Sequence, residues 1–379
     1  MHIVDRYLLR QYVKTFLICW CSLTGLYVVV DAFSNLDEFL RYAEESKRKL
    51  LPLLGEFYLF RSISFFDRVS AVLAMVSAMF TITWIQRHNE LTALMAAGVS
   101  RIRTATPVMA AAVVVTFIAV ACRELLIPTF RDQMTRDPRD LLQDSVYEMS
   151  TFVDNETDVM IQGQTYHPKE QRIHRPKFVL PPGLDAFGIH LSARDAVYLP
   201  KTETHPAGYL LKEITSSPQL LKSESLKQAE REIILTPVDH GDFLGADECF
   251  FVCNVDFDQL TAGKKLRQFM STGELIDGLR NPSLDYGADV RVSIHSRIVQ
   301  PLLDITLLFL GLPLVLRRET KNIYGAIGIC VALTAAFMLV VVASQHLGSI
   351  LYIRPSLAAW LPLLIFVPAA VNLYDRIDR

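Results

Sequence analysis

Six stretches of the chain are almost free of charge and are long enough to cross a membrane as helices. A helix needs about 20 mainly apolar residues to span roughly 30 Å of hydrocarbon. Gly348 and Pro355 separate the last two stretches, which would otherwise run together. No small-x-small cleavage site follows the first stretch, so we expect a span there and not a cleavable signal peptide. The pattern predicts transmembrane helices near residues 13–33, 69–86, 104–122, 298–316, 322–346 and 355–374.

The pattern changes between Glu124 and Val290, where charged residues return and turn residues recur at short intervals. Short segments rich in Val, Ile, Phe or Tyr and bounded by turn residues are typical of antiparallel strands. Several such strands predict a sandwich or a jellyroll-like domain. We expect helical connectors on either side of it, at 123–149 and 266–280. The predicted strands are 157–161, 177–179, 186–191, 196–199, 209–214, 232–235 and 249–256.

Two cysteines, Cys249 and Cys253, fall on the last predicted strand. Residues four apart on a strand share a face but lie roughly 13 Å apart. That separation is too long for a disulfide. Buried free thiols are therefore favoured over a metal or redox site.

A short helix is predicted between the second and third spans, at about 87–100. Leu91, Leu94, Met95 and Val99 recur at helical spacing and form an apolar stripe. Gly98 is placed to end the helix in a left-handed conformation, and the next serine can cap the following span. Two interpretations stay open: a surface helix lying among lipid headgroups, or a plug that fits a groove on a soluble partner.

Basic residues near the span ends predict the orientation, because Lys and Arg beside membrane helices are retained in the cytoplasm. With both termini cytoplasmic, the opposite side holds a loop at 34–68, the β-rich segment and a tight turn at 348–354. The fold class is thus a six-span α-helical membrane protein with an inserted extracytoplasmic β-jellyroll-like domain. The basic groups are Arg6, Arg10 and Lys14; Arg87, Arg101 and Arg103; Arg317, Arg318 and Lys321; and Arg376 and Arg379.

Composition and motifs exclude several functions. A net charge of −2 gives no reason to expect nucleic acid as a partner. The sequence has no Gly-x-x-x-x-Gly-Lys-Ser/Thr loop, so energy from ATP would have to come from a partner. It also lacks His-Glu-x-x-His and Gly-x-Ser-x-Gly, which argues against a membrane-embedded hydrolase.

Several segments resemble the lipopolysaccharide-export permeases of the LptF/LptG family. The most specific is the run Asn89-Glu-Leu-Thr-Ala-Leu-Met-Ala-Ala-Gly-Val-Ser100, in the loop between the second and third spans. The resemblance covers nearly the whole chain and does not distinguish the F type from the G type. The other matching segments are Ile3-Val-Asp-Arg-Tyr-Leu8, Ser271-Thr-Gly-Glu-Leu275, the pattern Arg297…Pro301…Gly311-Leu-Pro313, and Pro355…Ala358-Ala-Trp-Leu-Pro362.

The resemblance implies a non-catalytic half-transporter in the cell inner membrane. The domains would be 1–124 with three spans, 125–290 with the periplasmic jellyroll, and 291–379 with three spans. It implies a second LptF/LptG-type permease, with a heterodimer favoured over a homodimer, a cytoplasmic ABC ATPase dimer that binds ATP and Mg, periplasmic jellyroll bridge proteins, and lipopolysaccharide or a related anionic lipid as cargo. No cofactor is expected in this chain. The alternative is a mechanotransmission or signalling subunit that transports nothing.

In this family the short loop helix is the coupling helix, and the acid at the position of Glu90 contacts the ATPase. The resemblance therefore assigns coupling to this segment. From the residues alone, Glu90 offers a carboxylate to a basic or backbone donor, and the Leu and Met side chains fill a groove. The predicted coupling residues are Arg87, Glu90, Leu91, Leu94, Met95 and Gly98.

An anionic lipid needs fixed cations near the outer ends of the spans, and arginine can donate two hydrogen bonds to one phosphate. Ordinary snorkelling, or pairing with Asp31, Asp37 or Asp67, explains each arginine equally well. Asp304 lies inside the fourth span and should face a cavity or a partner. Its candidate neighbours are Arg297, Arg68 or a donor from the paired subunit, and a protonated acid bonded to a neighbour on its own helix is an equal possibility. The candidate substrate-binding residues are Arg41, Arg61, Arg68, Arg291, Arg297 and Asp304.

Overall fold

The computed structural model divides into two compact units. One unit holds residues 1–36, 49–133 and 287–379, and the other holds 37–48 and 134–286. The basic residues Arg318, Lys321, Arg376 and Arg379, used above for orientation, lie outside the described residues. The structure describes residues 3–45, 47, 49–135, 147–167, 170–186, 188–202, 205–216, 219–228, 231–317 and 323–375.

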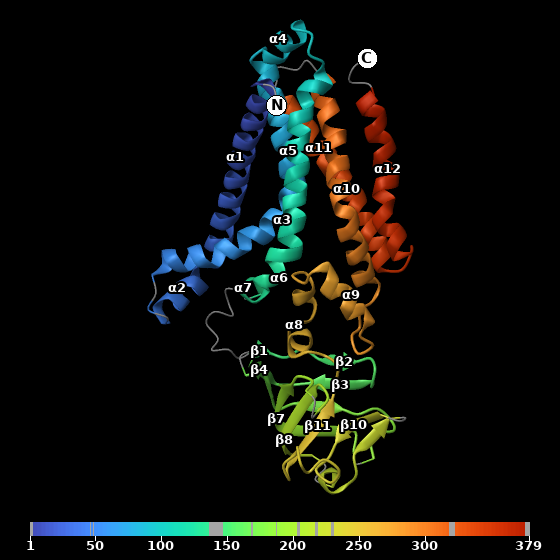
Figure 1. The fold of residues 1–379 in the computed structure, drawn as a ribbon. Coiled ribbons are helices and arrows are strands. Elements are labelled where there is room, and N and C mark those ends of the chain that lie inside the picture. Colours follow the sequence, from blue (N-terminus) through green and yellow to red (C-terminus); the bar gives the residue numbers. More distant parts are fainter. Residues whose placement is uncertain are drawn as a thin grey trace. The chain divides into compact units, whose positions relative to one another are not determined.

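The first unit is a bundle of long helices (Figure 1). Within the described residues, six helices are long and apolar enough to cross a membrane, which confirms the predicted six spans. The helices are α1 (Ile3–Ser34), α3 (Leu50–Arg87), α5 (Arg101–Ala121), α10 (Ala288–Arg317), α11 (Ile323–Ser349) and α12 (Pro355–Asp375).

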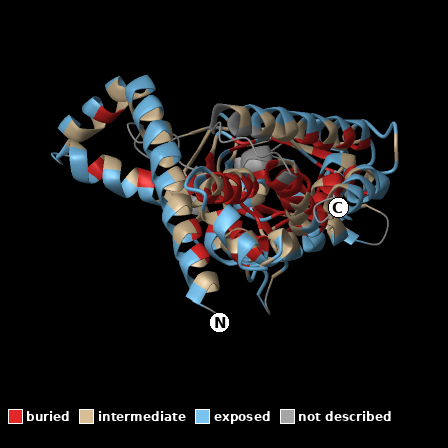
Figure 2. Ribbon diagram, turned by 90° about the horizontal axis from the view of Figure 1, so that it is seen from above, coloured by how far each residue is buried: buried red, intermediate tan, exposed pale blue. Residues whose placement is uncertain are grey.

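The core of the bundle lies mainly between α3, α5 and α10. Buried residues, red in Figure 2, gather inside the bundle, while exposed positions cover its outside. Met75 and Met79 on α3 belong to the same hydrophobic cluster as Leu307 and Leu310 on α10. Gly311 permits this close approach, because an added Cβ would lie only 2.8 Å from the sulfur of Met75. The Gly311 motif noted in the sequence is thus a helix-packing site.

The segment expected to be an outer loop, 34–68, is largely helical. Helix α2 (Leu36–Glu45) follows α1, and α3 begins at Leu50, well before the apolar stretch begins. The charged residues Glu56 and Asp67 lower the local hydropathy but do not break a helix. Beyond α5 the chain continues through a π-helical turn, η1 (Cys122–Leu126), then α6 (Ile127–Thr129) and α7 (Arg131–Thr135).

The second unit contains an antiparallel sheet inserted between the third and fourth spans. Its strands are β1 (Tyr147–Glu148), β2 (Phe152–Asp154), β3 (Val159–Gln162), β4 (Thr165–His167), β5 (Arg172–His174), β6 (Lys177–Val179), β7 (His190–Leu199), β8 (Gly208–Ile214), β9 (Leu226–Gln228), β10 (Arg231–Leu235) and β11 (Glu248–Val252). A short 3₁₀ turn, η3 (Leu220–Lys222), precedes β9. Two helices, α8 (Phe257–Arg267) and α9 (Thr272–Arg280), follow the last strand.

The long strand β7 joins the two parts of this sheet. Its first residues pair with β6, and its later residues pair with β5 on one side and β8 on the other. One path through the sheet runs β1-β4-β5-β7-β8-β11-β10-β9, while β2 and β3 extend from β6. Phe178 on β6 and Phe251 on β11 pack with ring centroids 5.1 Å apart and are fully buried. The predicted inserted antiparallel domain is therefore confirmed.

The predicted strands differ from the observed ones mainly at their ends. The predicted strand 177–179 coincides with β6. The prediction 186–191 overlaps β7 only at His190 and Leu191, and the prediction 196–199 is the last part of the same strand. The connector predicted as helix over 123–149 includes β1, and residues 136–146 of it lie outside the described residues. Cys249 and Cys253 are both buried and free, as expected.

Helix α9 begins with a reciprocal cap. The hydroxyl of Ser271 accepts a hydrogen bond from the backbone N–H of Glu274 at 3.2 Å. The Glu274 carboxylate in turn accepts from the backbone N–H of Ser271 at 2.7 Å. The motif Ser271–Leu275 is therefore a capping box that starts α9.

Candidate functional site

A short helix, α4 (Glu90–Ala96), connects the spans α3 and α5. It is shorter than the predicted 87–100, because Arg87 is the last residue of α3. A ring nitrogen of His88 lies 2.8 Å from the carbonyl oxygen of Trp84. Asn89 then adopts a left-handed conformation with φ 58°, which suits asparagine. The chain therefore turns sharply between α3 and α4.

The other end of α4 is closed by a Schellman motif. Gly98 has φ +84°, and its N–H donates to the carbonyl of Met95 at 2.9 Å. The N–H of Val99 donates to the carbonyl of Leu94 at 3.0 Å. These two bonds satisfy carbonyls that the helix end would leave open. The hydroxyl of Ser100 then caps α5 by accepting a backbone N–H of its first turn at 3.2 Å.

The apolar stripe of α4 faces the bundle's own core. Leu91 is 5% exposed and belongs to the same cluster as the α3 and α5 core residues. Met95 packs against that cluster, while Leu94 and Val99 are half-buried. Burying a leucine side chain stabilises a fold by about 1.5–3 kcal/mol. Leu91 therefore fixes α4 to the bundle, and we do not assign it to the surface that meets a partner.

The carboxylate of Glu90 is held by the first helix of the chain. The hydroxyl of Tyr7 on α1 lies 2.9 Å from one oxygen of Glu90 and 3.1 Å from the other. Two residues earlier, Asp5 forms an ion pair with Arg103 at the start of α5, at 3.3 Å. Sequence reasoning missed Tyr7 and Asp5, although both lie in the N-terminal motif Ile3–Leu8.

The five candidate arginines lie in different environments. Arg61 on α3 stacks over the ring of Phe57, 4.4 Å from its centroid. Arg68 on α3 and Arg291 on α10 are exposed. The remaining two are Arg297, half-buried on α10, and Arg41, exposed on α2 in the other compact unit.

Asp304 on α10 is buried and bonded within its own helix. It is 8% exposed, and its carboxylate accepts a hydrogen bond from the side-chain amide of Gln300 at 2.7 Å. The expected contact with a neighbour on the same helix is therefore present, with the carboxyl group as the acceptor. Asp304 also interacts electrostatically with Arg123 and Asp67.

Arg123 and Asp67 form a second polar contact that the sequence did not predict. The Nε of Arg123, in η1, donates to both oxygens of Asp67 at 3.0 and 3.1 Å, and its Nη2 lies 2.8 Å from one of them. Both side chains are less than one-fifth exposed. The pair joins α3 to the end of the third span. Each residue borders an apolar run in the sequence, but the pairing itself requires the fold.

Comparison with protein-family models shows the family to which this chain belongs. The model for the lipopolysaccharide export system permease LptF/LptG matches residues 6–175 and 214–376, which includes α4 and all six spans. The chain belongs to the LptF/LptG family. No curated protein gives a significant match. This chain is thus an LptF/LptG permease of the lipopolysaccharide export system, a multi-pass membrane protein and a non-catalytic transmembrane subunit.

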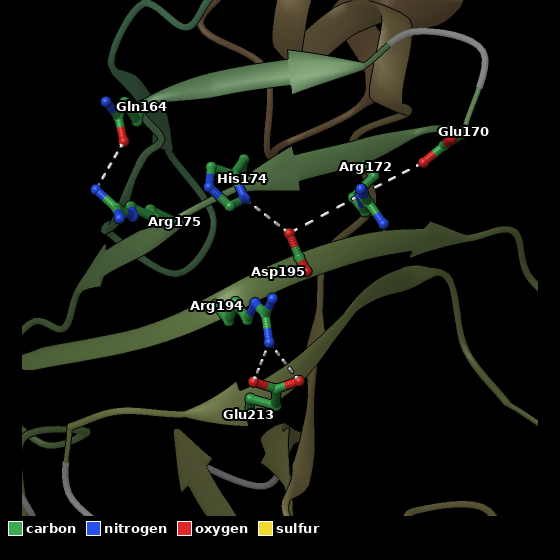
Figure 3. Close-up of polar contacts among 8 residues, drawn as sticks. All are labelled: Gln164, Glu170, Arg172, His174, Arg175, Arg194, Asp195 and Glu213. Carbon is green, nitrogen blue, oxygen red and sulfur yellow. Dashed lines mark hydrogen bonds and ion pairs between the residues drawn. The ribbon is translucent and has the colours of Figure 1, made fainter.

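The unmatched segment of this LptF/LptG permease, 176–213, lies within the sheet domain and includes β6 and β7. Polar side chains of β7 make cross-strand contacts on the sheet (Figure 3). Asp195 lies 3.0 Å from Nδ1 of His174 and 3.8 Å from Nε of Arg172. Arg194 pairs with Glu213 at 3.0 Å. These contacts use opposite charges across neighbouring strands and support the pairing of β5, β7 and β8.

Proposed function

We propose that α4 is the element through which a cytoplasmic ATPase dimer drives this permease. The observation that carries the proposal is Glu90, a half-buried carboxylate at the start of a short helix that is closed at its far end by Gly98. Ionised acceptors make the stronger hydrogen bonds at protein interfaces. The sequence lacks a phosphate-binding loop, so ATP and Mg would be bound by the partner.

The packing of α4 suits the transfer of force. Leu91 holds the helix to the core shared by α3 and α5, so a push on α4 acts on both spans together. The exposed residues Thr92, Ala93 and Ala96 and the half-buried Leu94 remain for contact with the ATPase. Protein interiors are closely packed and transmit displacement with little compression.

The test uses the transporter complex, which is affinity-purified with this permease as the bait and reconstituted with lipopolysaccharide. Glu90→Ala is expected to reduce lipopolysaccharide-stimulated ATP turnover about tenfold or more, because losing one hydrogen bond to a charged group costs roughly 1.5–3 kcal/mol. The amount of ATPase that copurifies reports docking separately from turnover.

The matched control is Glu45→Ala, which removes an exposed glutamate from α2. This variant should retain full turnover. Turnover by Glu90→Ala equal to that of the control would contradict the assigned role of α4.

We also propose that a second LptF/LptG-type permease, in a heterodimer, completes the transporter. The apolar stretch of α1 has no buried residue, and that of α11 is only 22% buried, compared with 67% for α3. Among the described residues these stretches are largely exposed, which leaves them to meet the second permease and to form the lateral openings for the lipid. Cross-linking from exposed positions of α1 and α11 to the second subunit would test the arrangement.

The cargo would leave the inner membrane toward the periplasm. Both termini and α4 would be cytoplasmic, according to the basic residues near the span ends. Arg68 and Arg291 are exposed cations suited to lipid phosphates, and the sheet domain would pass the lipid to periplasmic jellyroll bridge proteins. A cysteine placed at Thr92 tests this orientation. A reagent that cannot cross the membrane should label it only when added from the cytoplasmic side.

A further inference from the structure

The first turns of α1 contact both sides of the α4 loop. Tyr7 donates its hydroxyl hydrogen bond to Glu90, the first residue of α4. Asp5 pairs with Arg103, just beyond the end of the loop. Three helices that are separate in the sequence, α1, α4 and α5, therefore meet through these side chains.

The same end of α1 is where the helix is buried. Leu8 and Tyr12 are each 1% exposed and belong to the cluster that includes Leu91 of α4. These two are the buried residues of α1. Close to Tyr7, α1 is thus packed into the core that carries α4.

The rest of α1 has no buried residue and meets α3 through aromatic and polar side chains. Its contacts with α3 include a stack of Tyr27 on Phe65, with centroids 4.6 Å apart, and a hydrogen bond from Tyr58 to Asp31 at 2.7 Å. Most of its other large side chains are exposed. Because its buried residues lie near Tyr7, α1 is packed most tightly at the end that contacts α4.

We propose that Tyr7 is a positioning residue that joins α1 to α4, so that movement of α4 on ATP binding is passed to α1. This inference rests on the proposed function of α4, and it adds the path from α4 to one span. Asp5 and Arg103 form a second link beside the first.

The critical variant is Tyr7→Phe, which keeps the ring and removes only the hydroxyl. Tyr7 is 45% exposed, so the change leaves no polar group in a dry core. Spin labels at Phe33 on α1 and Ile298 on α10, both exposed, would follow α1 in a cysteine-depleted complex with its ATPase. In the parent complex, trapping with ATP and vanadate should shift the distance between the labels.

In Tyr7→Phe the population with the shifted distance should fall about three- to tenfold, the size expected for one hydrogen bond. ATPase docking and basal ATP turnover should stay unchanged. The control is Tyr12→Phe on the same helix, whose hydroxyl donates to the carbonyl of Ala74 on α3 at 3.5 Å. This control should behave like the parent.

The outcomes separate the two proposals. If Glu90→Ala retains normal stimulated turnover, the proposed function of α4 fails. If Glu90→Ala loses turnover but Tyr7→Phe shifts like the parent, only the link to α1 fails. Two further results would overturn the link. In one, trapping does not shift the label distance in the parent complex, so α1 does not move. In the other, Tyr7→Phe loses ATPase docking, so Tyr7 acts in docking and not in passing movement to α1.

Discussion

The carboxylate of Glu232 on β10 is held between two basic side chains. Nζ of Lys227 lies 2.9 Å from one oxygen, and Nε2 of His240 lies 3.1 Å from the other. The hydrogen bond from Lys227, followed by that from His240, lowers the pKa of Glu232. An acid whose pKa falls on folding stabilises the fold above its unfolded pKa of about 4.3, and this contribution is lost as the pH falls through the folded value.

Glu232→Gln should therefore lower the melting temperature of the purified protein slightly at pH 7. The Lys227 and Glu232 side chains are partly exposed, so the decrease in the free energy of unfolding is expected to stay within about 1 kcal/mol. At a pH below the folded pKa of Glu232 the parent and the variant should melt together, because the parent carboxyl is then also neutral. A difference that persists at low pH would show that packing, and not charge, explains the effect.

Burial also makes the thiol of Cys249 unreactive. It raises the pKa of Cys249 to about 12. At pH 8 only about one thiol in ten thousand is then ionised, and the thiolate is the reactive form. Mass spectrometry after treatment with iodoacetamide at pH 8 should show no labelling of Cys249 until the protein is unfolded in detergent. A cysteine placed at exposed Ser150 should label at once.

The role of a single residue could be predicted from the sequence where it depends on neighbouring residues in the chain. Gly98 and Ser100 were expected to end one helix and start the next, and both do so. The partners of Glu90 and Asp67 were missed because Tyr7 and Arg123 lie 83 and 56 residues away. No local spacing rule indicates such a contact. The fold alone brings the groups together.

At the scale of the element, α4 depends on the left-handed conformation of Gly98. A Cβ added at Gly98 would meet no atom within 4 Å, so Gly98→Ala would be penalised by its backbone conformation alone. That penalty is about 1–2 kcal/mol. The end of α4 should loosen, and hydrogen exchange at the amides of Gly98 and Val99 should accelerate about five- to thirtyfold.

Gly25→Ala provides the comparison for this variant. Gly25 also has open space around its Cβ position, but it lies inside α1 without a positive φ. Alanine is favoured over glycine in a helix interior, so this change should leave exchange in α4 unaltered and stabilise α1 slightly. Equal exchange in the two variants would mean that α4 does not depend on its Schellman closure.

The elements themselves followed from the sequence to different degrees. The six spans could be predicted because a membrane requires long apolar helices, and their hydropathy is distinctive. Helix α3 extends to Leu50 because charge ends an apolar run without ending a helix. Strands of two or three residues, such as β1 and β9, are too short to show alternation and become visible only through their pairing.

At the scale of the whole molecule, the ion pair between Arg123 and Asp67 ties two spans of the bundle together. The pair is less than one-fifth exposed, and buried Asp304 interacts with both members. A π-helical turn in the third span carries Arg123. Such turns often occur at functional sites. Removing Arg123 leaves the carboxylates of Asp67 and Asp304 facing a low-dielectric interior without this cation.

Arg123→Met should therefore lower the free energy of unfolding in detergent by about 3–5 kcal/mol, the usual effect of removing one partner from a buried pair. Adding Asp67→Leu should restore most of that stability, because the double variant leaves neither charge unpaired. Asp67→Leu alone should also lower the free energy of unfolding, because it leaves the Arg123 guanidinium buried without its carboxylate partner. If the two single effects simply add in the double variant, the pair does not hold α3 to the third span, and the stability of the bundle must come from apolar packing around Gly311 and Met75.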